Sequence, residues 1–174
     1  RVGCVIVQSS IINDELSKKI IAEGVHEVFG GPHAEVNAIS PLCKGGGGGF
    51  CLKDCEVYLT LEPCDHFPGK KMPSCTELLI SKKPKKVVVG SLDPRFQGAN
   101  VAKLRRAGIE VEVRDSPECR ALNPFFSKFV KTGMPFVTLK LAQSVDGKIT
   151  RPPPPQSLSR RGEREENYIS NELS

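Results

Sequence analysis

The alternation of strand-like and helix-like segments constrains the fold of this chain more than any other feature. Short runs of β-branched and aromatic residues recur, and segments of helical length separate them. Parallel strands need such long crossover connections, which are usually helices, so the pattern predicts a three-layer α/β/α sandwich around a mixed, mostly parallel sheet. The expected strands are 56–64, 85–91 and 109–113, and the expected helices are 74–83 and 100–108.

The first forty residues fit the same architecture. Residues 2–7 (VGCVIV) predict a strand, and residues 18–26 (KKIIAEGVH) predict a partner that pairs back on it across a polar loop at 8–17. The apolar spacing in residues 32–40 (PHAEVNAIS) predicts a helix with Pro32 in its first turn. The chain begins inside a strand, so we expect the first domain to lack its own beginning.

The pattern changes near residue 133, after a final predicted helix that is broken near Pro124. The segment MPFVTLKLAQSVDGKIT predicts a strand followed by a turn, as at the start of a new domain. The sequence that follows is rich in Pro, Ser and charge and cannot make a core by itself. We therefore assign residues 1–133 to one domain and residues 134–174 to the beginning of a second, incomplete α/β domain.

Charge and cysteine content limit the classes of function. The net charge is +5 in 174 residues, and the one basic run, at 81–86, is typical of a solvated helix end, so no nucleic-acid partner is expected. No apolar run approaches the ~20 residues that cross a bilayer, so no membrane segment is expected. Seven cysteines, an odd number, favour a reducing compartment and metal or catalytic use over a disulfide framework.

One histidine and two cysteines are candidate zinc ligands: His33, Cys64 and Cys75. Zinc accepts imidazole and thiolate, and a catalytic zinc keeps three protein ligands with one position open. Cys64 follows a strand at the carboxyl edge of the predicted sheet. Cys75 lies in the first turn of a helix that Ser74 and Glu77 cap, where the helix dipole favours a thiolate.

Glu35 is the candidate general acid and base. Zinc lowers the pKa of water towards ~7, and a carboxylate nearby can carry a proton from that water to a leaving nitrogen. Residues at i and i+2 of a helix point about 200° apart. His33 and Glu35 can therefore cooperate only if the metal lies at the helix end, within its first turn.

Each of these residues alone would be unremarkable, since a lone His at a helix start is usually only polar and a lone Cys usually only fills space. Their combination has the form of H-x-E…P-C-x-x-C, the pattern of zinc nucleobase deaminases. Here HAE and EPC are present, but Cys75 lies eleven residues beyond Cys64 instead of three.

The segments PHAEVNAI, VYLTLEPCDH, GKKMPSC, AGIEV and KTGMPFVTLKLAQSVDGKI together resemble the bifunctional deaminase/reductase family of riboflavin biosynthesis. That family has a wide gap between its zinc cysteines, and the resemblance runs almost from end to end. It implies a cytidine-deaminase-like domain that hydrolyses the amine of a diaminopyrimidinone ribosylamino phosphate. It also implies an NADPH-dependent reductase domain, of which this chain holds only the beginning.

The resemblance assigns roles to individual residues. It implies that His33, Cys64 and Cys75 bind zinc and that Glu35 shuttles the proton. His26, seven residues before His33, matches a histidine that contacts the substrate, and a neutral imidazole can hydrogen-bond a pyrimidine.

Further substrate contacts follow from the resemblance, with departures from the family pattern. Lys70 matches a lysine expected at the substrate phosphate, although Lys71 could take that role because the loop is two residues longer than usual. Asp93 matches an acidic residue at the ribose. Arg95 stands where an asparagine normally helps to hold the substrate, and the five glycines at 45–49 are an unusual insertion.

Two other functions stay open at this point. One is a different deaminase of the same fold that acts on a free nucleoside or on tRNA. The other is a non-catalytic, zinc-bound remnant. The resemblance favours a small phosphorylated pyrimidine as partner, allows an oligomer, and fits either bacterial cytoplasm or a plastid.

Overall fold

The structure is a computed structural model that describes residues 1–12, 15–44, 52–67, 69–70 and 72–149. The chain divides into two compact units, Arg1–Phe136 and Val137–Ser174. The candidate site residues belong to the first unit. Lys71 and the glycine insertion at 45–49 lie outside the described residues.

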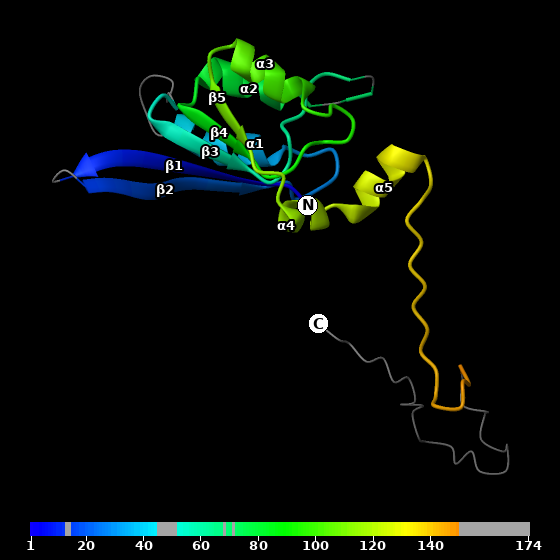
Figure 1. The fold of residues 1–174 in the computed structure, drawn as a ribbon. Helices are drawn as coiled ribbons and strands as arrows, with labels where there is room; N and C mark the ends of the chain where they lie inside the picture. Colours follow the sequence, from blue (N-terminus) through cyan, green and yellow to red (C-terminus); the bar gives the residue numbers. More distant parts are fainter. Residues whose placement is uncertain (13–14, 45–51, 68, 71, 150–174) are drawn as a thin grey trace. The chain divides into compact units, whose positions relative to one another are not determined.

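A five-stranded sheet with the order β2-β1-β3-β4-β5 forms the centre of the first unit (Figure 1). β1 pairs antiparallel with both of its neighbours, and β3, β4 and β5 are parallel. Four strands therefore point one way, which confirms the mixed, mostly parallel sheet. The strands are β1 (Gly3–Ile12), β2 (Glu15–Val25), β3 (Cys55–Leu59), β4 (Lys86–Val89) and β5 (Glu110–Val113).

The predicted loop at residues 8–17 was wrong in part, because both strands of the first hairpin continue through it. Gln8 pairs with Lys19, and the pairing continues as far as Ile12 and Glu15. Main-chain groups make the ladder of an antiparallel pair, so polar residues in this stretch do not end it.

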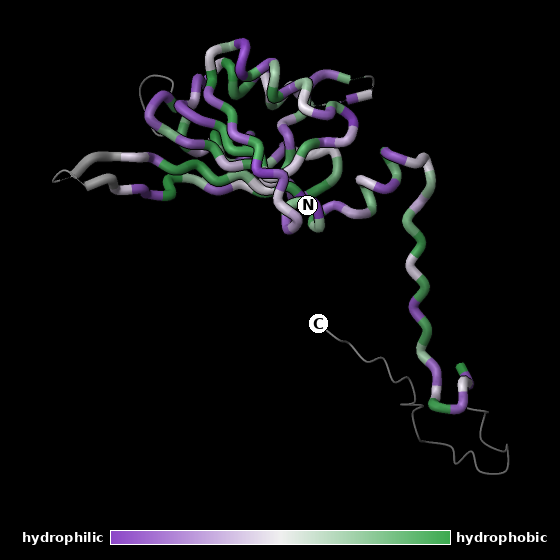
Figure 2. The backbone as a smooth tube through the Cα atoms, in the orientation of Figure 1, coloured by the Kyte–Doolittle hydropathy of each residue, from purple (hydrophilic) through white to green (hydrophobic). Residues whose placement is uncertain are grey.

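The five helices are α1 (Ala34–Lys44), α2 (Cys75–Lys82), α3 (Ala99–Arg106), α4 (Pro117–Ala121) and α5 (Pro124–Thr132). The break near Pro124 is thus confirmed. Residues of α1, α2 and α3 share one buried cluster with alternate residues of the strands, so these three helices cover one face of the sheet. Figure 2 shows the apolar positions concentrated in the strands beneath them.

α4 starts the layer on the opposite face. Val87 and Val89 of β4 point into the helix-covered core, so Gly90 faces the other way. A Cβ at Gly90 would overlap Cys119 of α4, and the absence of a side chain at Gly90 therefore allows this helix to approach. Together with α1–α3, α4 gives the predicted α/β/α arrangement.

The strand predicted just after residue 133 does not form in the described part of the chain, where residues 134–144 have no regular structure. A strand needs a neighbour to satisfy its main-chain groups. The apolar residues that suggested it are largely exposed: Val137, Leu139 and Leu141. The predicted turn is present, with Ser144 bonded to Lys148 through main-chain and side-chain contacts. The assignment of 134–174 to a second domain stays a prediction.

Among the described residues, no helix is long and apolar enough to span a bilayer.

Candidate metal centre and active site

Three side chains meet as the sequence predicts: His33, Cys64 and Cys75. The Nδ1 atom of His33 lies 3.2 Å from the Cys64 sulfur and 3.4 Å from the Cys75 sulfur. The three donor atoms all lie within 4.8 Å of one another. Zinc bonds of about 2.0–2.3 Å in a tetrahedron place neighbouring donors about 3.5–3.8 Å apart. The donor types and their spacing therefore fit zinc, and we call these residues the zinc cluster.

Two members of the zinc cluster stand at helix starts, whereas Cys64 lies in the loop between β3, which ends at Leu59, and α2. Cys75 opens α2, and the Ser74 hydroxyl caps that helix by accepting the N–H of Glu77 at 3.1 Å. Thr76 connects the two cysteines, because both its N–H and its hydroxyl donate to the carbonyl oxygen of Cys64 at 3.0 Å. The sequence reasoning did not single out Thr76, whose position after Cys75 carries no signal of its own.

The geometry of α1 resolves the difficulty posed by the spacing of His33 and Glu35. The helix begins at Ala34, so His33 precedes it and only Glu35 lies in the first turn. Pro32 also lies before the helix instead of within its first turn, which corrects that detail of the prediction. The helical period does not apply across this start, and both side chains can reach the same end of the helix.

Gly24 on β2 allows the start of α1 to lie against the sheet. A Cβ at this position would overlap the carbonyl oxygen of Ala34 and the main chain of Ala38. The amide of Asn37 adds a second link by donating to the carbonyl oxygen of Val25 at 2.7 Å. Backbone contact without side chains thus fixes the turn that carries Glu35.

Glu35 is buried, with 2% of its surface exposed. Burial raises the pKa of its carboxyl above the ordinary value, and the negative charge of Cys64 acts in the same direction. A carboxyl whose pKa is raised binds a proton more readily than an exposed one, which suits a group that must take a proton from water and pass it on.

A hydrogen bond between the two cysteines shifts their pKa values in opposite directions. The Cys75 thiol donates to Cys64 and, together with the ammonium of Lys70, lowers the pKa of Cys64 to about 4. The same hydrogen bond and burial raise the pKa of Cys75. A thiolate is therefore ready at Cys64, and a thiolate is the form of cysteine that binds metal.

His26 and Lys70 both lie beside the zinc cluster. The ring of His26 packs edge-on against that of His33 at 5.2 Å, and its Nδ1 donates to the carbonyl oxygen of Pro32 at 3.0 Å. In the neutral ring this contact leaves Nε2 as an acceptor. The ammonium of Lys70 donates to the Cys64 sulfur at 3.0 Å and to the carbonyl oxygen of Pro73 at 2.9 Å. Its expected phosphate contact stays a prediction.

Asp93 and Arg95 lie together in the β4–α3 loop (residues 90–98). Asp93 is 1% exposed, and its carboxylate accepts the main-chain N–H of Arg95 at 2.8 Å. The guanidinium of Arg95 also donates to this carboxylate, at 2.7 Å from one terminal nitrogen. Asp93 thus contacts Arg95 here, and its expected role at a ribose stays a prediction.

Glu62 is a buried carboxylate that sequence reasoning missed. Its oxygens accept three main-chain N–H groups, from Asp93 at 3.1 Å and from Gly98 and Asn100 at 3.0 Å. These contacts hold both ends of the β4–α3 loop. The available signal was the glutamate directly before Pro63 and Cys64, since a charge so close to a predicted buried site needs partners.

A second group of possible ligands, Asp65, His66 and Glu77, lies next to the zinc cluster. The ammonium of Lys103 already contacts Asp65 at 2.9 Å and Glu77 at 3.8 Å. That positive charge offsets the carboxylates, so we assign no metal to this group.

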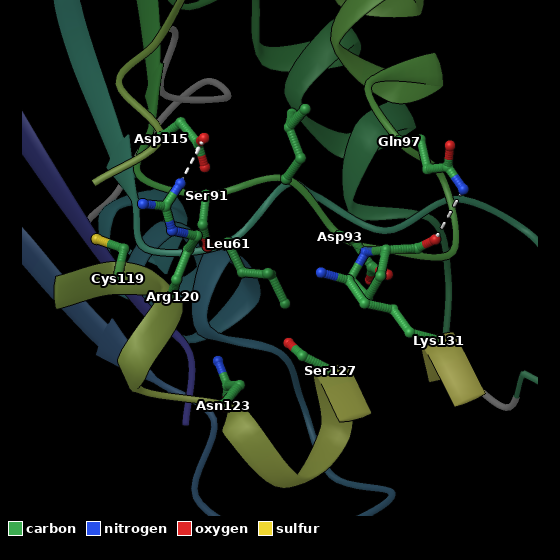
Figure 3. Close-up of a pocket in the computed structure, with 12 residues that line it drawn as sticks. Leu61, Ser91, Asp93, Gln97, Asp115, Cys119, Arg120, Asn123, Ser127 and Lys131 are labelled. Carbon is green, nitrogen blue, oxygen red and sulfur yellow. Dashed lines mark hydrogen bonds and ion pairs between the residues drawn. The ribbon is translucent and has the colours of Figure 1, made fainter. Parts of the chain in front are cut away.

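A cavity of about 370 Å³ lies at the carboxyl ends of β4 and β5, between the strands and the helices α4 and α5 (Figure 3). Asp93 lines it, whereas the residues of the zinc cluster do not. Arg120 and Asp115 form an ion pair within its wall. Among the candidate site residues, Asp93 therefore lies both in the β4–α3 loop and in the wall of this cavity.

Comparison with known proteins identifies the class. Residues 1–91 match the cytidine and deoxycytidylate deaminase zinc-binding region. A relative from Buchnera aphidicola, named diaminohydroxyphosphoribosylamino-pyrimidine deaminase, is 39% identical over 137 residues, which cover 77% of this chain and 82% of the relative. The fold and the zinc cluster thus define a zinc-dependent deaminase domain. The chain belongs to the cytidine and deoxycytidylate deaminase family.

Longer relatives match over most of this chain. The riboflavin biosynthesis protein RibD of Actinobacillus pleuropneumoniae is 43% identical over 151 residues, 85% of this chain and 36% of RibD. A solved deaminase/reductase structure from Thermotoga maritima has a TM-score of 0.67 at 39% identity, and the match covers 86% of this chain and 43% of that one. The chain therefore spans little more than a third of the RibD relative, and the cytidine-deaminase-like fold is confirmed.

Proposed function

We propose that this chain is the hydrolytic deaminase part of a riboflavin-biosynthesis protein. Its substrate would be the diaminopyrimidinone ribosylamino phosphate of that pathway. The observation that carries the proposal is the meeting of His33, Cys64 and Cys75 beside the buried carboxyl of Glu35.

The residues of the chain divide the chemistry among them. The zinc cluster would hold the ion, which supplies a Lewis acid that makes water a nucleophile near neutral pH. Glu35 takes a proton from the attacking water and delivers it to the amino nitrogen of the ring. The water oxygen adds to the ring carbon, the carbon–nitrogen bond breaks, and ammonia leaves. His26 would accept a hydrogen bond from the pyrimidine through Nε2, since its Nδ1 donates to Pro32.

The relatives' names support the choice of substrate. The Buchnera protein is named as a deaminase of the diaminohydroxyphosphoribosylamino-pyrimidine, and this chain covers most of it. The wide spacing of Cys64 and Cys75 supports the same choice over a nucleoside or tRNA deaminase. A longer parent protein would add an NADPH-dependent reductase activity, which we do not expect of residues 134–174. Bacterial cytoplasm or a plastid stays the predicted compartment, and an oligomer stays possible.

The Glu35→Gln variant tests this function. Glutamine keeps the size of the side chain but cannot shuttle a proton. We expect the zinc content to be unchanged and ammonia release from the diaminopyrimidinone phosphate to fall by about 10²- to 10⁴-fold. Glu110→Gln, on an exposed part of β5, is the matched control and should retain the activity.

Three results would contradict the proposal. Full activity of Glu35→Gln would remove the assigned mechanism. Ammonia release from cytidine, with none from the diaminopyrimidinone phosphate, would point to another deaminase of this family. Zinc binding without turnover of either compound would indicate the non-catalytic, zinc-bound alternative.

A further inference from the structure

The guanidinium of Arg95 is fixed in place by hydrogen bonds to Asp93. Its Nε atom lies 3.1 and 3.2 Å from the two carboxylate oxygens of Asp93, and one terminal nitrogen lies 2.7 Å from the second oxygen. The planar guanidinium and carboxylate thus meet edge to edge. Such a paired contact fixes direction as well as distance.

Three phenylalanine rings surround the same guanidinium. Its central carbon lies 4.7 Å from the ring centre of Phe67, 5.3 Å from Phe96 and 4.9 Å from Phe126. These rings come from the loop after Cys64, from the β4–α3 loop and from α5. Cation–π contacts of this kind position the guanidinium without using its hydrogen-bond donors. Arg95 is therefore pre-positioned by both its charge partner and its aromatic neighbours.

Part of the guanidinium remains available for a ligand. Arginine has five N–H donors, and Asp93 uses those of Nε and of one terminal nitrogen. The other terminal nitrogen makes no hydrogen bond to any residue that the structure describes. The side chain of Arg95 is 33% exposed, so these donors have access to solvent. A fixed, accessible pair of N–H groups matches an oxyanion.

Lys70 places a second cation near Phe67 and the zinc cluster. Its ammonium lies 6.0 Å from the Phe67 ring centre and 3.0 Å from the Cys64 sulfur. The cations of Lys70 and Arg95 thus both lie within about 6 Å of the same ring centre.

We propose that Arg95 is a specificity-determining residue that binds the phosphate of the substrate, together with Lys70. This inference rests on the proposed function for the identity of the phosphorylated substrate. Asp93 then orients Arg95 instead of contacting the sugar. The charge of Asp93 offsets that of Arg95 in the free protein, and a phosphate that carries two negative charges would engage both cations.

Binding of ribose 5-phosphate to the zinc-loaded protein tests the inference without using turnover. Isothermal titration calorimetry should detect ribose 5-phosphate, and ribose, its uncharged counterpart, should bind far more weakly. Arg95→Asn should weaken ribose 5-phosphate binding by about 10- to 100-fold, the range expected for hydrogen bonds to a charged group. The affinity of Arg95→Lys for ribose 5-phosphate should lie between those of the parent and of Arg95→Asn, since lysine keeps the charge but lacks the planar pair of donors. Arg114→Asn, which removes another ion-paired arginine, should bind as the parent does.

The outcomes separate this inference from a structural role and from the proposed function. No binding by the parent protein, or equal binding by a folded, zinc-containing Arg95→Asn variant, would overturn it. If Arg95→Asn does not fold, Arg95→Lys decides: unchanged binding by this variant would also overturn the inference. Arg95-dependent binding in a protein that releases no ammonia would remove the proposed function and keep the anion site.

Discussion

The zinc cluster and the β4–α3 loop lie in one unit of the chain, but different forces hold their side chains. His33 precedes α1 and Cys75 opens α2, and the positions of these helices follow from core packing and helix capping. Cys64 lies in the loop after β3, where Thr76 of α2 binds its carbonyl oxygen. The path of the β4–α3 loop instead depends on main-chain contacts to Glu62, and the pairing of Asp93 with Arg95 orients the side chains of the loop. Secondary structure therefore determines the metal site, whereas a few specific polar contacts determine the loop.

The first consequence is that a defect in the zinc cluster should abolish function altogether. Cys75→Ser replaces a thiolate ligand with a hydroxyl, which binds zinc poorly, so we expect zinc content to fall to near zero and ammonia release to vanish. Elemental analysis and the ammonia assay measure both. Cys43→Ser, at an exposed thiol outside the cluster, is the control and should keep a full complement of zinc. A Cys75→Ser protein that retained one zinc would show that the cluster is not the metal site.

A smaller effect on activity is expected when the start of α1 shifts but the zinc cluster keeps all three ligands. Gly24→Ala inserts a methyl group against Ala34 and Ala38, so the start of α1 must shift. Overpacking of this kind costs about 1–3 kcal/mol of unfolding free energy, and a displacement of about 1 Å can lower kcat about 100-fold. Denaturant melts and steady-state kinetics measure the two effects.

Gly3→Ala is the matched control for Gly24→Ala. A Cβ at Gly3 would lie 3.6 Å from the Thr60 side chain, an ordinary contact distance, so stability and kcat should hardly change. Equal behaviour of the two variants would contradict the claim that close packing of β2 on α1 positions Glu35.

The mildest effect on turnover is expected at the β4–α3 loop. Glu62→Gln keeps the shape of the side chain but replaces one accepting oxygen with an NH2 group, which cannot accept, so at least one of the three main-chain N–H groups loses its partner. We expect a loss of about 1.5–3 kcal/mol in unfolding free energy. The affinity for substrate should weaken, seen as a higher KM, while zinc content stays full. Glu23→Gln, at an exposed position on β2, controls for the change of charge. Loss of zinc in Glu62→Gln would show that the two regions are not independent.

Sequence patterns were sufficient for the zinc cluster because its donor types are those that zinc accepts and its residues stand in the motifs HAE and EPC. These motifs and the family resemblance predict that His33, Cys64 and Cys75 meet. The turn at Glu35 needed the structure, since one residue more or less in α1 decides whether it can share a site with His33.

The contacts of the β4–α3 loop could not be predicted in the same way. Glu62 binds main-chain N–H groups, which are present in every residue and leave no trace in a sequence. The pairing of Arg95 with Phe126 joins residues 31 positions apart, across two elements, and no local pattern indicates it. The strand predicted after residue 133 failed for a related reason, because a strand pattern specifies a sheet face but not the partner that must pair with it.

The hydrogen bonds of Glu62 to main-chain N–H groups also affect how the β4–α3 loop can change in evolution. The Glu62 carboxylate binds only the main-chain N–H groups of Asp93, Gly98 and Asn100, so it places no demand on the side chain at position 95. A substitution at position 95 can therefore alter what the loop offers to a ligand while the loop keeps its path. If Arg95 binds the phosphate as we propose, the change from the asparagine that the family resemblance expects alters substrate preference without cost to the metal site.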